Sequence, residues 1–327
     1  MNKLFYLITS FLIIFTGCSS KQYFEPENTL SFQEETYNIE SPIIDLNSDG
    51  ATLENNAFIT KKGTISNTKE DYRFLNFIGN TTISSNLSAK VHLKNESLDE
   101  EIQFDKNIVS ASKKENLIAV GSVDNSITLY NLDTKQIIFK EYLKPSLINN
   151  VKIANPIFLQ RVVLFPTLDG KIVIVDLLKN QIVKTINIDP ESDVNNIIFM
   201  KENTDTLIAA TSKKLFSFLN NRVHLKDVDI QSIIVKDNYI YVATLDGNII
   251  KYDSSLNQLA SQKFKFAKIN ALAFGTSLYA LESQDFLINI SEDFKDVKIF
   301  DFSFDEEEKV IAIDNKIYFE DEYIIVK

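Results

Sequence analysis

The sequence has no tryptophan, one cysteine, two histidines and eight glycines among its 327 residues. A single cysteine excludes an internal disulfide and every Cys-x-x-Cys motif. His92 and His224 stand far apart, each alone among strand-forming residues, so they predict no metal site. The glycines include neither a phosphate-binding loop nor a Gly-x-Ser-x-Gly nucleophile elbow. We therefore expect no catalytic residues, no cofactor and no small-molecule substrate.

The sequence also has fewer basic than acidic residues, which gives a formal net charge of −11. An acidic protein is repelled by phosphate backbones and by anionic headgroups, which argues against a nucleic-acid partner and against electrostatic membrane binding. The acidic runs at 99–101 and 305–308 are interpreted as solvated surface turns, since adjacent like charges suit water better than an acid/base pair.

The one long apolar run lies at residues 4–15, after Lys3 and before Gly17-Cys18. It is too short for a helix across about 30 Å of hydrocarbon, and its order of charge, apolar run and small residue is that of a secretory signal. It resembles the bacterial lipoprotein signal, which implies a signal peptide over 1–17 and acylation of Cys18. Membrane lipid is then the first expected partner, held through two or three acyl chains. Ser19 after the cysteine favours the outer membrane, with the protein facing the periplasm.

The remaining chain divides into two parts. Residues 18–36 are polar, contain Pro26 and show no sustained apolar period, so we expect the lipidated cysteine to be followed by a flexible tether. Residues 37–327 form the folded domain, and Ile, Leu, Val, Phe and Tyr dominate its apolar positions, which predicts β-strands nearly throughout.

A repeat runs through this domain. Residues 117–131, 162–176, 206–220, 239–253 and 277–291 share one frame, and their closing residues are separated by steps of 45, 44, 33 and 38. Weaker copies occupy 82–95 and 310–321. Each copy is two apolar runs joined by a polar turn, and further apolar segments lie before and after it. Four short strands per unit at this period predict an all-β fold, a β-propeller of antiparallel four-stranded blades.

The turns of three copies carry the strongest local signals. These are Asp124-Asn125, Asp169-Gly170 and Asp246-Gly247. Asp-Gly between apolar runs favours a two-residue type I′ hairpin, in which both central residues have positive φ. We interpret these residues as structural turn formers and not as calcium ligands.

Counting copies predicts seven blades, or eight if residues 43–65 form a blade of their own. The chain ends on the strand-like run 323–326, so we expect N- and C-terminal strands to share one blade and close the ring. The phenylalanine pairs at 264/266 and 300/302 are expected to point into the core. The connections at 99–106, 144–150 and 189–196 are the first places to look for a partner-binding surface.

A lipoprotein cysteine followed by blades of apolar run, Leu-Asp-Gly, apolar run and Tyr-Asp, as at 239–253, resembles the quinoprotein-like propellers, and among them the BamB-like outer-membrane lipoproteins. The resemblance covers residues 37–327. It implies a non-catalytic periplasmic scaffold for outer-membrane β-barrel assembly that binds BamA and nascent outer-membrane proteins. It identifies no partner-contacting residues.

Two alternatives stand beside this reading. The first is a propeller lipoprotein that scaffolds another envelope complex or is displayed at the surface as an adhesin. The second is a quinone-dependent dehydrogenase, which we reject because the sequence lacks the tryptophans and neighbouring cysteines that such enzymes place against the cofactor.

Overall fold

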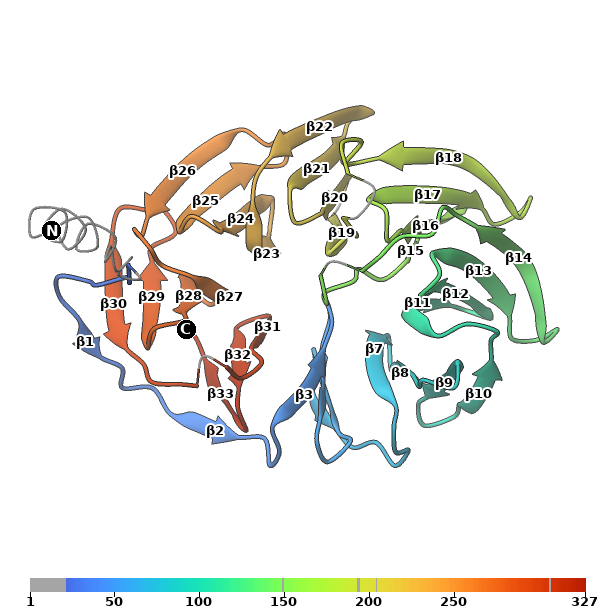
Figure 1. Cartoon of the computed structure of the whole chain (residues 1–327), viewed down its shortest axis with the longest axis horizontal. Coiled ribbons are helices and arrows are strands. Elements are labelled where there is room, and N and C mark those ends of the chain that lie inside the picture. Colours follow the sequence, from blue (N-terminus) through green and yellow to red (C-terminus); the bar gives the residue numbers. More distant parts are fainter. Residues whose placement is uncertain (1–21, 149, 193–194, 204, 306) are drawn as a thin grey trace, which may run out of the picture.

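The computed structural model describes residues 22–148, 150–192, 195–203, 205–305 and 307–327. All regular elements in these ranges are β-strands, and they form eight sheets around a common axis (Figure 1). Each sheet is a blade of the ring, with its first strand at the centre and its last strand at the rim (Figure 1). The prediction of a β-propeller with four-stranded antiparallel blades is confirmed.

The first four blades follow one another along the chain. Blade 1 contains β3 (Ile43–Leu46), β4 (Ala51–Leu53), β5 (Phe58–Thr60) and β6 (Gly63–Ile65). Blade 2 contains β7 (Arg73–Ile78), β8 (Thr81–Ser85), β9 (Lys90–Lys94) and β10 (Asp99–Gln103). Blade 3 contains β11 (Ile108–Lys114), β12 (Leu117–Ser122), β13 (Ser126–Asn131) and β14 (Gln136–Tyr142). Blade 4 contains β15 (Ile157–Phe158), β16 (Val162–Pro166), β17 (Lys171–Asp176) and β18 (Gln181–Asn187).

The other four blades complete the ring. Blade 5 contains β19 (Phe199–Asn203), β20 (Thr206–Ala210), β21 (Lys214–Leu219) and β22 (Arg222–Asp227). Blade 6 contains β23 (Ile230–Lys236), β24 (Tyr239–Thr244), β25 (Asn248–Asp253) and β26 (Gln258–Lys263). Blade 7 contains β27 (Ile269–Phe274), β28 (Leu278–Glu282), β29 (Phe286–Ile290) and β30 (Val297–Asp301). Blade 8 contains β31 (Ile311–Ile313), β32 (Lys316–Phe319) and β33 (Glu322–Ile325).

Two N-terminal strands close the ring at its last two blades. Strand β2 (Thr36–Asn38) pairs antiparallel with β33 and is the fourth strand of blade 8. Strand β1 (Leu30–Ser31) adds to β30 in parallel, as a fifth strand of blade 7. The rings of Tyr37 and Tyr323 stack across the β2–β33 pair, 5.1 Å apart. The predicted closure by terminal strands is thus confirmed, and it covers two sheet edges that would otherwise be open to pairing.

The described residues form eight blades, so the preferred count of seven is wrong and the alternative holds. Residues 43–65 make blade 1, whose last three strands have only three residues each. Runs this short cannot show the two-residue alternation by which the other blades are recognised.

The blades are held together by apolar seams. Each of the eight buried apolar clusters draws its side chains mainly from two neighbouring blades, and one of them joins blade 8 to blade 1 through Ile311, Tyr318 and Ile43. Without tryptophan, most seams are aliphatic. A completely buried Leu, Ile or Val stabilises the fold by about 1.5–3 kcal/mol. The apolar contacts between blades therefore stabilise a chain whose single cysteine allows no internal disulfide.

The predicted 18–36 tether is described from residue 22 onward, and in that part it contacts the ring at two points. The Phe24 ring packs edge-on against Phe264 and Phe286, with centroids 6.0 and 5.5 Å away, and the Phe32 ring packs against Phe300 and Phe302. The Phe24 backbone N–H donates to the side chain of Gln284 at 2.8 Å. Polar composition suggested flexibility, but Phe24 and Phe32 supply enough apolar contact to hold the segment.

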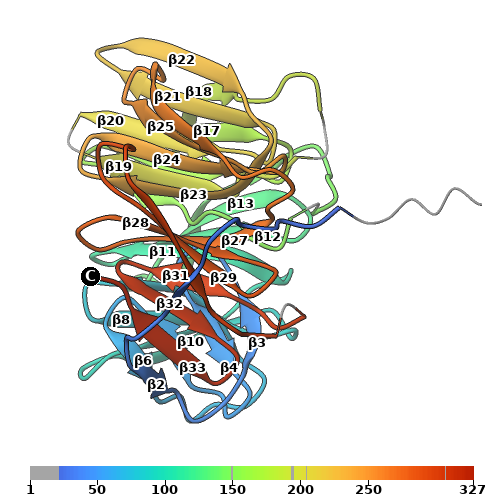
Figure 2. The same ribbon diagram turned by 90° about the vertical axis from the view of Figure 1, so that its left-hand side faces the viewer.

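The ring has two faces. The face that we call the channel face carries the turns between the first and second and between the third and fourth strands of each blade. The opposite face, here the Phe24 face, carries the turns between second and third strands and the connections between blades. Figure 2 shows the first described residues on one side of the ring and the C-terminus on the other. The two faces therefore offer separate surfaces.

Candidate functional site

A cavity of about 930 Å³ lies in the central channel, and most of its lining residues come from inner strands and from turns of the channel face. Residues of the inner strands β7, β19, β23, β27 and β31 line it, together with the β3–β4 turn. Inner strands of a propeller run in the same direction, so their ends meet at one mouth (Figure 1). Residues far apart in the chain thereby share one site.

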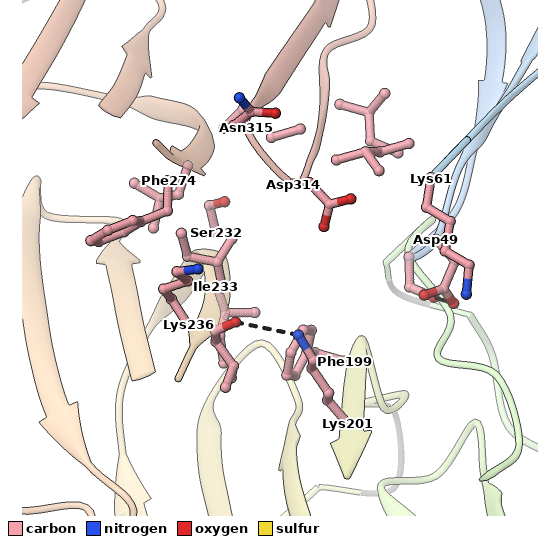
Figure 3. Close-up of a pocket in the computed structure, with 18 of the residues that line it drawn as sticks. Asp49, Lys61, Phe199, Lys201, Ser232, Ile233, Lys236, Phe274, Asp314 and Asn315 are labelled. Atoms are coloured by element: carbon pink, nitrogen blue, oxygen red, sulfur yellow. Dashed lines mark hydrogen bonds between the residues drawn. The ribbon is translucent and has the colours of Figure 1, made fainter. Parts of the chain in front are cut away.

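The cavity is richer in positive than in negative side chains, against the acidic balance of the whole chain. Its lysines are Lys61, Lys152, Lys201, Lys236 and Lys327, and its carboxylate side chains are Asp49 and Asp314. Figure 3 shows Lys61, Lys201 and Lys236 entering from different elements around the cavity, with Asp314 directed toward its middle. A cleft with one prevailing sign of charge attracts ligands of the opposite sign.

Two of these lysines have defined neighbours. The ammonium of Lys201 donates to the carbonyl oxygen of Val235 at 3.3 Å, which ties blade 5 to blade 6 (Figure 3). The ammonium of Lys61 lies 6.0 Å from the centre of the Phe77 ring. Both side chains are exposed, so their charges are available at the mouth.

Lys152 lies deeper, on the connection from β14 to β15. Its backbone is fixed by Asn196, whose side-chain amide donates to the Lys152 carbonyl at 2.9 Å. Burial lowers the pKa of Lys152 from its ordinary value. Among the described residues no carboxylate lies within ion-pair distance of its ammonium. Lys152 is therefore a half-buried lysine of the channel with no ion pair in the described part of the chain.

An asparagine network forms the wall beside this lysine. The side-chain amide of Asn155 donates to Asp49 at 2.6 Å and to the Leu75 carbonyl at 2.9 Å, and its oxygen accepts from the Ala111 N–H at 2.9 Å. Asn47 also donates to the Leu75 carbonyl, at 2.9 Å. Leu75 is the extra residue of a β-bulge in β7, which leaves its carbonyl outside the ladder. Blades 1 to 4 are thus joined at the channel.

The predicted turn residues lie outside the cavity, on the Phe24 face. Asn125 links two blades, because its side-chain amide donates to Asp169 at 3.0 Å and its oxygen accepts from the Leu168 N–H at 2.8 Å. Burial favours a higher pKa for Asp169, but the ion pair with Lys171 and the hydrogen bonds from Thr167 and Asn125 outweigh it and hold the pKa below its ordinary value. Asp169 is therefore an ionised carboxylate buried between blades 3 and 4.

The third turn is more exposed. Hydrogen bonds from Lys263, Thr244 and Asn248 hold the pKa of Asp246 well below its ordinary value. Asp124 accepts from Ser126 in its own turn, with an Oγ–Oδ1 distance of 2.7 Å. Both carboxylates thus stabilise local turn geometry.

The expected type I′ geometry of the Asp-Gly turns is wrong. Gly170 and Gly247 have φ of 74° and 80°, but neither aspartate has a positive φ. The N–H of Gly247 donates to the Thr244 carbonyl at 3.0 Å, which is a type I turn followed by a left-handed glycine. A β-carbon on Gly247 would lie 2.2 Å from the Phe264 carbonyl oxygen, so glycine is required there for space as well.

His92 and the acidic run 99–101 belong to blade 2. His92 is buried, and its Nε2 lies 2.8 Å from the Asp99 carboxylate. Residues 99–101 are part of β10 and not a turn, because lysines of the neighbouring chain segments neutralise them: Glu101 pairs with Lys90 at 2.7 Å. Asp305 lies between strands as expected. No group of three potential metal ligands occurs in the described part of the chain.

Cys18 lies outside the described residues, so its acylation stays a prediction. Within the described ranges, no helix has the length and apolarity needed to cross a membrane. Of the suggested partner-binding loops, 99–103 is strand β10, while 144–150 and 189–196 lie on the Phe24 face; positions 149, 193 and 194 are not described. Phe266 is 40% exposed and not in the core, since it follows the end of β26.

The channel lysines were missed by sequence reasoning. They occupy the inner-strand ends of blades 5 and 6, a turn of blade 1, a connection and the C-terminal residue, and none falls in the repeated hairpin frame. Aligning the residues that follow each inner strand is the signal that could have found them.

The fold defines the class: an eight-bladed β-propeller with a lysine-lined central cavity. No family model matches the chain. Two curated proteins do, the plasminogen-binding proteins PgbB of Helicobacter pylori strains J99 and 26695. They are 29% and 28% identical over 386 and 385 aligned residues, which cover 99% of this chain and 71% of each relative.

Solved structures share the fold at lower identity. BamB from Moraxella catarrhalis is 12% identical, with a TM-score of 0.65 over 90% of this chain and all of that one. The C-terminal WD40 domain of Sif2 is 13% identical, with a TM-score of 0.64 over 91% of this chain and all of that one. These likenesses confirm the propeller and carry no function. The sequence relatives are binding proteins by name, and no comparison indicates an enzyme.

Proposed function

We propose that this chain is a lipid-anchored outer-membrane propeller that binds plasminogen at the cell surface and has no catalytic role. The observation that carries this proposal is the similarity to two plasminogen-binding proteins along 99% of the chain. The match covers 71% of each relative. Surface display is the alternative interpretation of the sequence, and the two sequence relatives support it. A role in β-barrel assembly is supported only by the fold shared with BamB.

The anchor is the thiol of Cys18. Two or three acyl chains on this residue would hold the protein at the membrane without a membrane-spanning segment. The outer membrane is the proposed location, and the side on which the ring lies follows from the partner: plasminogen binding requires the outer surface, whereas BamA binding requires the periplasm.

The proposed binding surface is the mouth of the central channel. It is concave, it is framed by rigid strands, and it presents exposed lysines in a chain of net charge −11. Loops and strand ends on a rigid scaffold are the usual place for protein binding in such folds. Exposed lysines at a rim mainly raise the association rate with an acidic partner surface and make it sensitive to salt.

The test is plasminogen binding by the full mature chain, with Cys18→Ser to avoid detergent. We expect saturable binding that weakens with salt, and a slower association for the double variant Lys201→Glu/Lys236→Glu. Lys184→Glu is the matched control, because Lys184 is exposed on the outer strand β18 far from the mouth. Binding of equal strength by both variants would move the site away from the channel, and no binding by the parent protein would refute plasminogen as the partner.

A second experiment decides between the surface and the periplasm. Intact cells that produce the full chain are treated with protease, and the membranes are separately solubilised for affinity capture. Surface display predicts cleavage of the ring on intact cells. Protection from protease together with co-purification of BamA would contradict the proposal and restore the assembly role.

A further inference from the structure

The exposed apolar side chains of the ring are distributed unequally between its two faces. Among the described residues, seven large apolar side chains in the turns and connections of the Phe24 face are exposed: Leu87, Val123, Leu147, Ile148, Val151, Leu245 and Phe266. The channel face has one in its turns, Leu178. Scattered apolar residues are normal on a surface. The Phe24 face has the longer connections, and three of its seven residues lie on the one between β14 and β15, but the other four lie on four separate short segments, against one residue for the whole channel face.

The apolar residues extend around the ring and protrude from it. Leu87 projects from blade 2 and Leu245 from blade 6, with 87% and 57% of their surfaces exposed. Leu147 and Val151 lie on the connection between blades 3 and 4, and are 75% and 71% exposed. Side chains on several separate turns of one face can meet a flat surface together. A narrow groove for a peptide would instead bring them into one cluster.

The N-terminal chain reaches the ring on this same face. Phe24 is docked between Phe264 on the connection after β26 and Phe286 at the start of β29, and its N–H is bound by Gln284 in the β28–β29 turn. Tyr23, beside it, is 52% exposed. An exposed tyrosine next to an anchored segment is typical of the boundary between lipid and water.

The distance from this docking point to the lipid anchor is short. Cys18 precedes Phe24 by six residues, and an extended chain covers at most about 3.6 Å per residue, so the Cα atoms of the two residues are at most about 22 Å apart. Acyl chains on Cys18 must therefore enter the membrane close to the Phe24 face. A long flexible tether would have left the ring free to turn, but the docked segment removes that freedom.

We propose that the Phe24 face lies against the lipid bilayer, inserts its exposed apolar turns into the interface, and directs the channel mouth away from the membrane. This inference rests on the proposed acylation of Cys18, and it adds to the proposed function an orientation: the lysine-lined mouth is presented outward, where a soluble partner reaches it.

Charge does not carry this contact. On the Phe24 face, lysines are paired with aspartates: the Lys213 ammonium lies 2.5 Å from the Asp229 carboxylate, and the Lys263 ammonium lies 2.7 Å from that of Asp246. Neutralised pairs give little attraction to anionic headgroups, so the membrane contact depends on apolar insertion and is insensitive to salt. Plasminogen binding at the mouth is instead expected to weaken as the salt concentration rises.

The experiment uses the full acylated chain reconstituted in vesicles of phosphatidylethanolamine and phosphatidylglycerol. Because the only native cysteine is consumed by acylation, a single introduced cysteine can carry an environment-sensitive fluorophore. We label Leu147→Cys, Leu245→Cys and, as the matched control on the channel face, Leu178→Cys. With a quencher attached to the lipid headgroups, we expect a loss of emission at positions 147 and 245, unchanged in high salt, and no loss at 178.

A second variant tests the role of the docked segment. Phe24→Ser combined with a long Gly/Ser insertion before Phe24 is expected to abolish the difference between positions 147 and 178 while the protein stays vesicle-bound. Equal quenching at 147 and 178 in the parent protein, or quenching at 178 alone, would overturn the proposed orientation. Failure to float with vesicles would refute the anchor itself.

The same vesicles are then incubated with plasminogen. Quenching confined to the Phe24 face without plasminogen capture supports the orientation and refutes the proposed partner. Capture without that quenching pattern supports the partner and refutes the orientation.

Discussion

The side-chain amide of Asn155 donates a hydrogen bond of 2.9 Å to the carbonyl oxygen of Leu75, 80 positions earlier in the chain. The same side chain accepts from the buried Ala111 N–H at 2.9 Å. One residue thus satisfies backbone groups of blades 2 and 3 from the entry of blade 4. It holds the channel wall in a place where β-bulges interrupt the ladder.

Asn155→Ala is therefore expected to destabilise the ring. The buried Ala111 N–H loses its acceptor, which costs about 1–3 kcal/mol in free energy of unfolding. Urea denaturation of the mature chain measures this, with Asn238→Ala, on an exposed turn, as the control. Equal midpoints for both variants would show that water replaces the lost amide.

The seams between blades predict a larger effect from a core truncation. Phe165 is fully buried in the seam between blades 3 and 4, beside Ala119 and Leu129. Phe165→Ala is expected to lower the free energy of unfolding by about 3–5 kcal/mol. Leu178→Ala, at an exposed turn, should change it little. A loss below 1 kcal/mol for Phe165→Ala would mean that the seam collapses around the cavity.

Sequence reasoning recovered the architecture because the repeat copies carry their hairpins in one frame. It left the blade at residues 43–65 as an alternative because β4, β5 and β6 are only three residues long, too short for a periodic signal. It treated residues 99–101 as a turn because three adjacent carboxylates suggest solvent, but cross-strand lysines such as Lys90 stabilise them on β10.

The candidate site was harder to predict for a geometric reason. A channel mouth collects one or two residues from each blade, and residues such as Lys201 and Lys236 follow no shared spacing. The role of Phe24 also depends on a three-dimensional partner, the Phe264–Phe286 pair, which lies far along the chain. The amino-acid composition around residue 24 does not indicate that Phe24 packs against these two distant residues.

Asp169 predicts a pH dependence of stability. Its pKa is lowered in the folded state, so its contribution is fully present above the unfolded pKa of about 3.9 and is lost as the pH falls through the folded pKa. Asp169→Asn should cost about 1–3 kcal/mol at pH 7, because the hydrogen bonds to a buried carboxylate are weakened. The difference from the parent protein should shrink steadily below pH 4.

Thermal unfolding between pH 7 and pH 3 measures that difference, and Asp237→Asn, on an exposed turn, is the control. A gap between parent and Asp169→Asn that stays constant over this range would mean that geometry and not ionisation supplies the effect.

The charge of Lys152 is expected to lower stability at neutral pH, whereas that of Asp169 raises it. Burial lowers its pKa, so the protonated form opposes folding at neutral pH, and stability should rise as the pH increases toward the unfolded pKa of about 10.4. Lys152→Met keeps a long unbranched side chain, one heavy atom shorter, and removes the cation. We expect its melting temperature at pH 7 to exceed that of the parent.

The advantage of Lys152→Met should decline as the pH rises toward the unfolded pKa of about 10.4, and Lys184→Met on the outer strand β18 is the control substitution. A lower melting temperature for Lys152→Met at every pH would contradict the argument from burial. That result would mean that the ammonium is stabilised in the channel by an interaction with a bound anion, and it would make Lys152 the first residue to test for ligand binding.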